Sequence, residues 1–227
     1  MQLLIDADVL TYRVGFACNE ESEAIAIKTM EGFVVDMIAD LFIGQELTWR
    51  LFLSGKENFR NEIAVTAPYK GNRTKDKPVH IEALRDYLVD VWGATVSKGQ
   101  EADDDIAIAA TSNPDAVICS VDKDFYQVPG KNYNFVTKEH KSFTEAEALI
   151  WPYMQMLMGD GVDNIKGVKG IGLVKSRKLL EGKTEAEMWE TVVDKLGYDR
   201  ALENARLVYL RREEDELWQP PVENNND

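Results

Sequence analysis

Cysteine and histidine are scarce in this sequence. Its 227 residues include two cysteines, Cys18 and Cys119, and two histidines, His80 and His140. Neither cysteine has a second cysteine or a histidine close to it in the sequence, so neither a disulfide framework nor a zinc site is supported. With so few histidines we do not expect a histidine-based catalytic triad. This use of cysteine is typical of a protein from a reducing cytoplasm.

The sequence also lacks a hydrophobic run of the roughly 18–20 residues that a membrane span needs. The longest apolar stretch, residues 33–43, is interrupted by Asp36 and Asp40. The first six residues, MQLLID, contain an acid and no basic cluster, so they do not resemble a signal peptide. We therefore expect a cytoplasmic protein without membrane contact, located in the host cytoplasm if its source is viral.

Positive charge is in deficit, because 26 basic residues face 40 acidic ones and the formal net charge is −14. Charge of that sign argues against a nucleic-acid binder when only the whole chain is considered. Two short stretches are nevertheless basic. Residues 69–77 (YKGNRTKDK) carry four bases and one acid, and residues 164–178 (NIKGVKGIGLVKSRK) carry five bases and no acid. Local basic patches of this kind suit a phosphate-binding surface.

The hydrophobic pattern predicts a mostly parallel α/β sheet flanked by helices, followed by a helical region. Strands and helices alternate in the first part of the chain, which is typical of this fold class. The expected strands are 2–5, 49–53, 116–121 and 133–136. The expected helices are 24–41, 79–92, 102–111, 144–158, 173–180, 185–196 and 201–212. The apolar stripe of 79–92 is expected to face the core rather than a ligand.

We place a domain boundary near residue 143, where the alternation of strands and helices ends. This gives an α/β domain at residues 1–143 and a helical region at residues 144–218. The polar tail, residues 219–227 (QPPVENNND), is expected to be frayed.

Acidic residues gather where the predicted strands end and where one predicted helix begins. In a parallel α/β sheet these positions border a common crevice, in which ligands bind. The i, i+2 spacing of the two acids after the third strand would point both carboxylates to one side of an extended chain. The acids are Asp6 after the first strand, Asp122 and Asp124 after the third, Glu101, Asp103 and Asp104 at the start of the helix 102–111, and Asp160 and Asp163 beside the second basic stretch.

A group of carboxylates without histidine or thiolate partners points to a hard metal ion. Like charges repel one another unless a cation neutralises them, and oxygen ligands favour Mg²⁺ or Mn²⁺. A single Asp would more often cap a helix or face solvent, but their repeated placement favours a metal site. An EF-hand calcium loop does not fit residues 160–163, which lack its ligand spacing and terminal Glu.

Glycines recur at residues 167–172 (GVKGIG), inside the second basic stretch. Such a turn exposes backbone N–H groups to phosphate and allows a close approach to nucleic acid. It is not a Walker A loop, because no Gly-Lys-Ser/Thr follows, and it is not a dinucleotide fingerprint, because no strand is expected before it. A plain turn between two helices is the alternative interpretation.

Taken in order, these motifs resemble the 5′-nuclease superfamily of flap endonucleases and 5′→3′ exonucleases with a PIN-like fold, and within it the compact bacteriophage 5′→3′ exonucleases. The likeness covers nearly the whole chain. It is carried by IDAD at 5–8, PYKGNR at 68–73, EADD at 101–104, SVDKDF at 120–125 and MGDGVDNIKGVKGIG at 158–172. It implies a PIN-like nuclease domain (1–143) with a helical arch near 71–100. It also implies a DNA-binding region (144–218) with a helix–three-turn–helix hairpin at about 157–181.

The resemblance implies a Mg²⁺-dependent, structure-selective 5′→3′ exonuclease and flap endonuclease that hydrolyses DNA phosphodiesters with two metal ions. By the same resemblance, Asp6, Glu101, Asp103, Asp104 and Asp122 serve one metal, and Asp124, Asp160 and Asp163 serve the other. The resemblance also implies that Lys70 and Arg73 contact the scissile phosphate. The implied DNA contacts are Arg13, Tyr69, Lys166, Lys169, Lys175 and Arg177, and K⁺ would bind loop carbonyls and the hydroxyl of Ser176. The partner is DNA with 5′ ends or flaps, the alternative is an RNA–DNA hybrid, and a monomer is expected.

Two departures from the family pattern leave alternatives open. Ser54 or Gly55 stands where relatives place another Asp after the second strand, and Glu57 is the nearest acid. An extra acid, Asp105, follows the EADD motif, so the choice of Asp104 depends on that pattern alone. A catalytically weak DNA-junction binding protein of the same fold is one alternative function, supported only by Ser54. A PIN-type ribonuclease is the other, and the basic stretch 164–178 argues against it.

Overall fold

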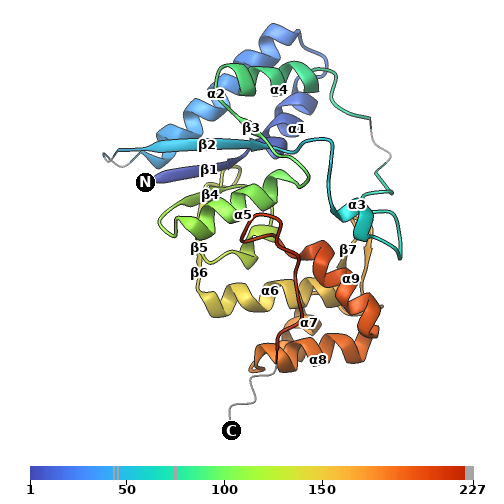
Figure 1. Cartoon of the computed structure of the whole chain (residues 1–227). Helices are drawn as coiled ribbons and strands as arrows, with labels where there is room; N and C mark the ends of the chain where they lie inside the picture. The colour runs from blue at the N-terminus through green and yellow to red at the C-terminus, as the bar shows by residue number, and fades with distance from the viewer. Residues whose placement is uncertain (43, 45, 74–75, 223–227) are drawn as a thin grey trace. The chain divides into compact units, whose positions relative to one another are not determined.

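The computed structural model describes residues 1–42, 44, 46–73 and 76–222 of the chain (Figure 1). The chain forms two compact units. Unit 1 comprises Met1–Glu57, Lys75–Phe125 and Gly130–Ser142, and unit 2 comprises Asn58–Thr74, Tyr126–Pro129 and Phe143–Asp227. Residues 223–227 of the expected frayed tail, and residues 74 and 75 of the expected arch, lie outside the described residues.

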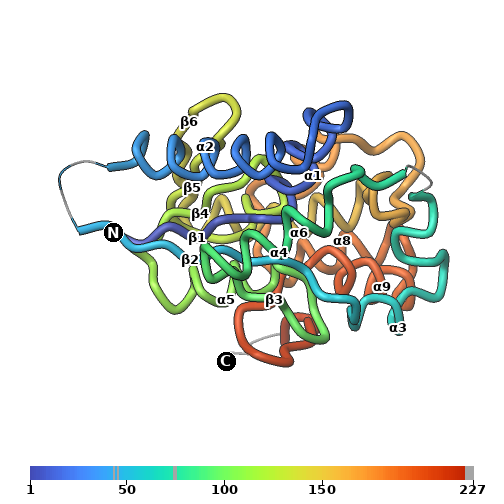
Figure 2. Tube along the Cα trace, turned by 90° about the horizontal axis from the view of Figure 1, so that it is seen from above, coloured from blue at the N-terminus to red at the C-terminus, as the bar shows by residue number. Residues whose placement is uncertain are grey.

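Unit 1 is built on a sheet with the strand order β3-β2-β1-β4-β5-β6, which can be followed from strand to strand in Figure 2. Its pairings from β3 through β5 are all parallel, which confirms the predicted mostly parallel sheet. The register pairs Asp6 with Phe52 and Ile5 with Cys119, so β1, β2 and β4 end at the same edge. The strands are β1 (Gln2–Asp6), β2 (Thr48–Leu53), β3 (Thr95–Val96), β4 (Val117–Cys119), β5 (Gly130–Asn134) and β6 (Glu139–Phe143).

Helices cover both faces of this sheet. Figure 1 shows α1 (Ala7–Ala17), α2 (Glu23–Leu41) and α4 (Ile81–Asp90) on one side of β1 and β2, and α5 (Ala102–Ser112) on the other. Successive side chains of a strand point to opposite faces, and Leu3 and Ile5 pack into the core under the first group of helices. Leu84 and Leu88 of α4 are fully buried in the same core. The apolar stripe of this helix therefore faces the core, as predicted.

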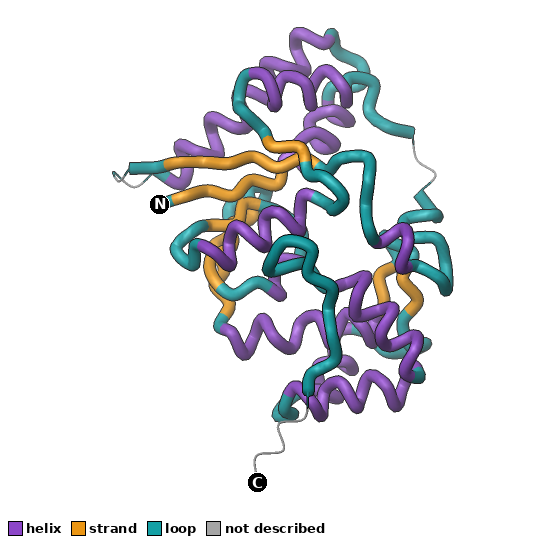
Figure 3. Tube along the Cα trace, viewed as in Figure 1, coloured by secondary structure: helices purple, strands orange, loops and turns teal. Residues whose placement is uncertain are grey.

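The described part of unit 2 is mainly helical and contains the short antiparallel β7–β8 hairpin, which Figure 3 shows in orange among purple helices. The long helix α6 packs against α7, α8 and α9, and its Met154 and Leu157 are fully buried. Thr144 and Thr184 cap α6 and α8 in capping boxes, which satisfy backbone N–H groups that a helix start leaves unpaired. The elements are α3 (Arg60–Ile63), α6 (Glu145–Met158), β7 (Gly159–Asp160), β8 (Ile165–Lys166), α7 (Leu173–Leu180), α8 (Glu185–Leu196) and α9 (Tyr198–Val208).

The helix expected at 201–212 is wrong at both ends, because α9 spans Tyr198–Val208. The chain leaves the helix where distant side chains take its backbone groups. Gln127 donates to the carbonyl of Val208 and accepts from the N–H of Leu210, both at 2.9 Å. Arg60 donates to the carbonyl of Tyr209 at 2.9 Å. These bonds replace the helical ones, and a local sequence pattern does not contain them. Among all the described helices, none has the length and apolarity of a membrane span.

Candidate active site

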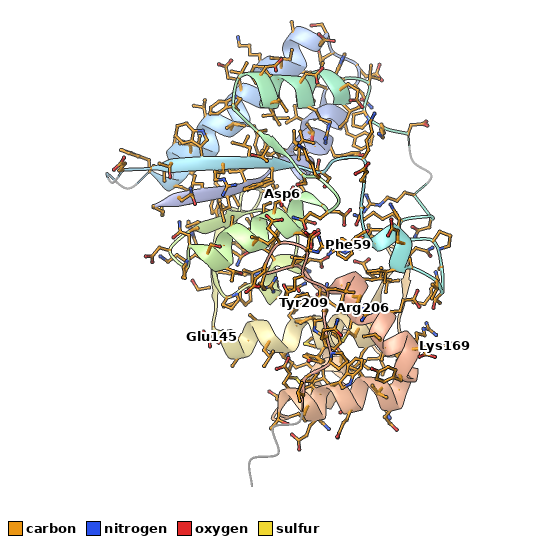
Figure 4. The ribbon with its side chains drawn as sticks, in the orientation of Figure 1. Asp6, Phe59, Glu145, Lys169, Arg206 and Tyr209 are labelled. Carbon is orange, nitrogen blue, oxygen red and sulfur yellow. The ribbon has the colours of Figure 1, made fainter. Side chains whose placement is uncertain are left out.

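Asp6 is the last residue of β1 and is 1% exposed (Figure 4). One carboxylate oxygen, Oδ1, caps α1 by accepting the N–H of Val9 at 3.1 Å, and Oδ2 accepts the hydroxyl of Ser120 at 2.7 Å. The pKa of Asp6 is raised from 3.8 to about 7, chiefly by burial; the negative charges of Asp8 and Asp122 add to this rise, and the two hydrogen bonds partly oppose it. A cation at this edge of the sheet would favour the charged form.

The chain turns after β4 instead of continuing as a strand. β4 ends at Cys119, and the hydroxyl of Ser120 accepts the N–H of Asp122 at 3.0 Å. The carboxylate of Asp122 then accepts the N–H of Asp124 at 2.9 Å, and Asp124 begins a 3₁₀ turn. Side-chain bonds to the backbone two residues later are typical of turns. The expectation of an extended strand to residue 121, with both carboxylates on one side of it, is therefore wrong.

The start of α5 gathers the next acids. Glu101 is the N-cap residue, and it forms a capping box with Asp104, which is fully buried and accepts the N–H of Glu101 at 3.2 Å. Asp105 accepts the hydroxyl of Ser97 and the amide of Gln100, so it serves the loop that leads into the helix. The two neighbouring acids thus differ in environment: Asp104 lies within the helix start and Asp105 lies against the loop.

Ser54, which with Gly55 was a candidate for the position of the missing acid, lies at a polar junction of unit 1. Its N–H donates to Oδ2 of Asp8 at 2.8 Å, and its hydroxyl accepts the N–H of Ala102 at 3.0 Å. Arg85 bridges the same residues, with Nη1 at 2.8 Å from Oδ1 of Asp8 and Nη2 at 2.6 Å from the carbonyl of Ser54. Gly55 is required next to it, because a Cβ there would lie 2.2 Å from the carbonyl oxygen of Ser97.

Asp8 and Arg85 were not among the site residues that the sequence suggested. The signal for Asp8 was present, because it lies two residues after Asp6 in the IDAD motif. Arg85 gave no signal, since a basic residue on the polar side of an amphipathic helix is ordinary. Together they place an ion pair at Ser54, which follows the end of β2, and two residues after Asp6 at the end of β1.

In unit 2, Asp160 and Asp163 lie on the tight β7–β8 hairpin. Gly159 pairs with Lys166, and a Cβ on Gly159 would lie 2.2 Å from the backbone nitrogen of Gly167, so this close pairing demands glycine. The carboxylate of Asp160 accepts the N–H of Val162 at 2.6 Å and that of Asp163 at 3.3 Å. Asp160 therefore shapes the turn that presents Asp163.

The turn at residues 68–73 closes onto this hairpin and brings three of its side chains to Asp163, which lies 90 to 94 residues later in the sequence. Tyr69 donates its hydroxyl to Oδ2 of Asp163 at 2.8 Å. Arg73 reaches Oδ1 with Nη2 at 2.7 Å, and Nζ of Lys70 lies 3.7 Å from Oδ2. The backbone N–H of Lys70 also donates to the carbonyl of Asp163 at 2.9 Å. All four are site residues that the resemblance indicated.

The basic residues expected to contact DNA lie on exposed positions. Lys166, Lys169, Lys175 and Arg177 are all exposed, and Lys169 projects away from the helices in Figure 4. Ser176, expected to help bind K⁺, is fully buried on α7 and donates its hydroxyl to the carbonyl of Leu173 at 3.0 Å.

Arg13 belongs to unit 1, where it is exposed on α1. Its guanidinium carbon lies 5.9 Å from the centre of the Phe33 ring. The charge is therefore accessible, while the side chain has an aromatic surface on which to pack.

The acids fit a magnesium ion by their chemistry. Within the part of the chain that the structure describes, no three His, Cys, Asp or Glu side chains form a ready-made metal-binding group. Mg²⁺ needs no such cage, because it usually takes one or two carboxylates together with waters and substrate phosphates. Oxygen-only donors, and the repulsion of Asp6 by Asp8 and Asp122, suit a hard divalent cation.

Residues 1–151 match the family model "5′-3′ exonuclease, N-terminal resolvase-like domain". The chain belongs to this 5′-3′ exonuclease family. It is 30% identical over 201 residues to the 5′-3′ exonuclease of Buchnera aphidicola subsp. Schizaphis graminum, an alignment that covers 79% of this chain and 69% of that protein. This family membership confirms the resemblance to the 5′-nuclease superfamily.

Solved structures of the bacteriophage T5 D15 protein have the same fold. The one co-crystallised with metal ions gives a TM-score of 0.64 at 18% identity and covers 91% of this chain and 88% of that one. A complex of the D15 flap endonuclease with DNA and metal ions gives a TM-score of 0.60 at 18% identity, with the same coverage. This likeness confirms the predicted PIN-like α/β fold.

Proposed function

We propose that this protein is a divalent-metal-dependent 5′ nuclease that hydrolyses DNA phosphodiesters at 5′ ends and flaps. The observation that carries the proposal is the buried Asp6 at the end of β1, whose pKa is raised by burial and by the charges of Asp8 and Asp122. A protein keeps such a costly group of acids where a bound cation neutralises them. Family membership and the metal ions in the D15 crystals support this interpretation.

We assign the acids of unit 1, Asp6, Glu101, Asp103, Asp104 and Asp122, to one Mg²⁺ or Mn²⁺ ion. Asp163 and Asp160 would serve a second, and the participation of Asp124 there stays a prediction. When bound, the ions would supply an activated water and stabilise the charge on the attacking and leaving oxygens.

Lys70 and Arg73 are the cationic side chains of this site. Fixed positive charges placed next to a reacting phosphate offset the charge that develops in the transition state. The closed turn at 68–73 places both side chains at Asp163, Lys70 at 3.7 Å and Arg73 at 2.7 Å. Their proximity to a proposed metal ligand supports a role at the scissile phosphate.

Duplex binding is assigned to residues 144–218, through the exposed Lys166, Lys169, Lys175 and Arg177. Gly172 caps the start of α7 without a side chain, which leaves backbone N–H groups accessible to a phosphate. Contacts of this kind hold the backbone without selecting a sequence. The helix–three-turn–helix form of this segment, the K⁺ site at Ser176 and cleavage of RNA–DNA hybrids belong to the same proposal.

The experiment is cleavage of a 5′-labelled duplex with a single-stranded 5′ flap, with Mg²⁺ or with EDTA. Asp122→Asn is the test variant and Asp115→Asn the matched control, because Asp115 is almost fully exposed and pairs only loosely with Lys131 at 3.9 Å. We expect Mg²⁺-dependent release of 5′ fragments, lost by more than about 100-fold in Asp122→Asn and kept in Asp115→Asn.

Other outcomes would identify the alternatives. A wild-type protein that binds the flap substrate tightly and never cuts it is a junction-binding protein. Cleavage of a single-stranded RNA, with the DNA flap left intact, would make it a ribonuclease.

A further inference from the structure

Both carboxylate oxygens of Asp163 are occupied by donors from the 68–73 turn. Oδ1 accepts Arg73 at 2.7 Å, and Oδ2 accepts the hydroxyl of Tyr69 at 2.8 Å, with Nζ of Lys70 3.7 Å away. The Asp163 side chain is 15% exposed and that of Arg73 is 49% exposed. A largely covered carboxylate is thus neutralised by a guanidinium that faces solvent on its other side.

The turn is held to the hairpin by further bonds that do not involve this carboxylate. The N–H of Lys70 donates to the backbone carbonyl of Asp163 at 2.9 Å. Asn72 donates to the carbonyl of Gly161 at 2.6 Å, and Asn164 donates to the carbonyl of Pro68 at 2.9 Å. If the Arg73 side chain moves away, these three bonds keep the turn in place.

A divalent cation bound through Oδ1 of Asp163 would compete with the guanidinium of Arg73 for that oxygen. Two cations within a few ångströms of each other repel, and Oδ1 is the atom that Arg73 holds in a short, charge-assisted hydrogen bond. The hydrogen bond to Oδ2 comes instead from the neutral Tyr69 hydroxyl at 2.8 Å, which a nearby metal ion repels far less, while the Lys70 ammonium lies farther away at 3.7 Å. Tyr69 can therefore keep the carboxylate oriented after Arg73 has left it.

We propose that Arg73 is a displaceable counter-ion of Asp163. In the metal-free protein its guanidinium neutralises the carboxylate, and binding of a divalent cation at Asp163 releases it toward a phosphate group of the substrate. A planar guanidinium binds phosphate through two parallel N–H donors, so the released side chain is suited to this second partner. Tyr69 is a positioning residue, because its hydroxyl holds the Asp163 carboxylate in orientation. This inference depends on the proposed function, since it takes Asp163 to be a metal ligand.

The test is the binding of Mn²⁺ alone to the full chain, measured by electron paramagnetic resonance of the free ion. Four proteins form a double-mutant cycle: wild type, Arg73→Ala, Asp163→Asn and the double variant. Asp163→Asn should weaken the Mn²⁺ site, and Arg73→Ala should tighten it about two- to fivefold, because removing an ion pair of this exposure frees the carboxylate. In the Asp163→Asn background, Arg73→Ala should have no further effect.

Two control variants separate competition for the Asp163 carboxylate from general effects of charge and folding. Lys195→Ala removes one positive charge from an exposed pair with Asp194 in unit 2 and should leave Mn²⁺ affinity unchanged. Arg73→Gln keeps a hydrogen-bond donor without the charge and should tighten Mn²⁺ binding less than Arg73→Ala. Circular dichroism and a thermal melt establish that each variant is folded.

The failures of the two proposals are distinguishable. If Asp163→Asn leaves Mn²⁺ binding unchanged, Asp163 is not a ligand and its place in the proposed metal site is lost. If Asp163→Asn weakens binding but Arg73→Ala leaves it unchanged or weaker, the metal role stands and the counter-ion role is overturned. If Arg73→Ala tightens Mn²⁺ binding equally in the Asp163→Asn background, the effect is long-range electrostatics and not competition for this carboxylate.

Discussion

The hydroxyl of Ser120 donates to Oδ2 of Asp6 at 2.7 Å and so ties the residue after β4 to the last residue of β1. The same hydroxyl accepts the N–H of Asp122 and so fixes the position of Asp122 in the turn that follows β4. One small side chain thus sets the geometry of two proposed metal ligands. Its hydrogen bond also lowers the pKa of Asp6, against the larger effect of burial, which raises that pKa.

The first prediction concerns the pH dependence of stability in the metal-free protein. The pKa of Asp6 is about 7 in the fold, compared with 3.8 for the ordinary side chain. Between these values the unfolded chain has lost a proton that the folded chain still holds, so the free energy of unfolding falls as pH rises from about 4 to about 7. The contribution of this residue is at most about 4 kcal/mol, since one pKa unit corresponds to about 1.36 kcal/mol.

Urea unfolding in EDTA, at steps between pH 4.5 and 8, measures this effect against Asp6→Asn. The variant keeps the shape of the side chain and cannot titrate there, so its stability should decline less over the interval. Identical slopes for the two proteins would show that Asp6 titrates near its ordinary value. Added Mg²⁺ should restore part of the wild-type stability above pH 7, because it favours the charged carboxylate.

The second prediction concerns the pair of Asp8 and Arg85, whose side chains are 24% and 23% exposed. Arg85→Ala removes the ion pair and the bond to the Ser54 carbonyl, and it leaves a partly buried carboxylate behind. We expect a loss of about 1–2 kcal/mol in the free energy of unfolding, measured in urea. Lys131→Ala, which breaks the loose exposed pair with Asp115, should cost less than about 0.5 kcal/mol. A similar small loss for Arg85→Ala would mean that solvent replaces both of its bonds.

The elements that the sequence predicted best are those with local signals. The expected bounds of α7 and α8 agree with the structure. The signals that determine them, the apolar spacing along each helix and the Thr184 capping box before α8, come from residues in or next to the helices themselves. The end of α9 was missed because it depends on Gln127 and Arg60, which lie 81 to 149 residues away in sequence from the groups that they bind. Local periodicity carries no information about a partner at that distance.

The same limit applies to the site. The position of Asp6 at a strand end and of Glu101 at a helix start follows from strand and helix patterns alone, and both were predicted. The ion pair of Asp8 and Arg85 joins residues 77 apart, and no pattern in either segment indicates the other. The short length of β4 was missed for a different reason, because Ser120 and Asp122 bind backbone groups that a strand would otherwise use.

The third prediction concerns Lys70, whose ammonium group lies 3.7 Å from Asp163. Lys70→Ala should lower the single-turnover rate of flap cleavage by about 100-fold or more while weakening DNA binding much less, because a charge at the reacting phosphate acts mainly in the transition state. Lys28→Ala, which removes an exposed lysine from α2, is the control and should keep the wild-type rate. A rate unchanged in Lys70→Ala would remove the residue from the catalytic machinery.

The fourth prediction concerns the exposed lysines of the glycine-rich loop and of α7. If Lys169 and Lys175 each neutralise one phosphate, the double alanine variant releases about two fewer counterions on binding a duplex. The slope of log affinity against log salt should then become shallower by about 1.8, and affinity at low salt should fall for every sequence alike. Lys183→Ala with Lys195→Ala removes the same charge from exposed positions elsewhere in unit 2. Fluorescence anisotropy at four salt concentrations separates the two pairs, and an equal slope in both would place the duplex away from this loop.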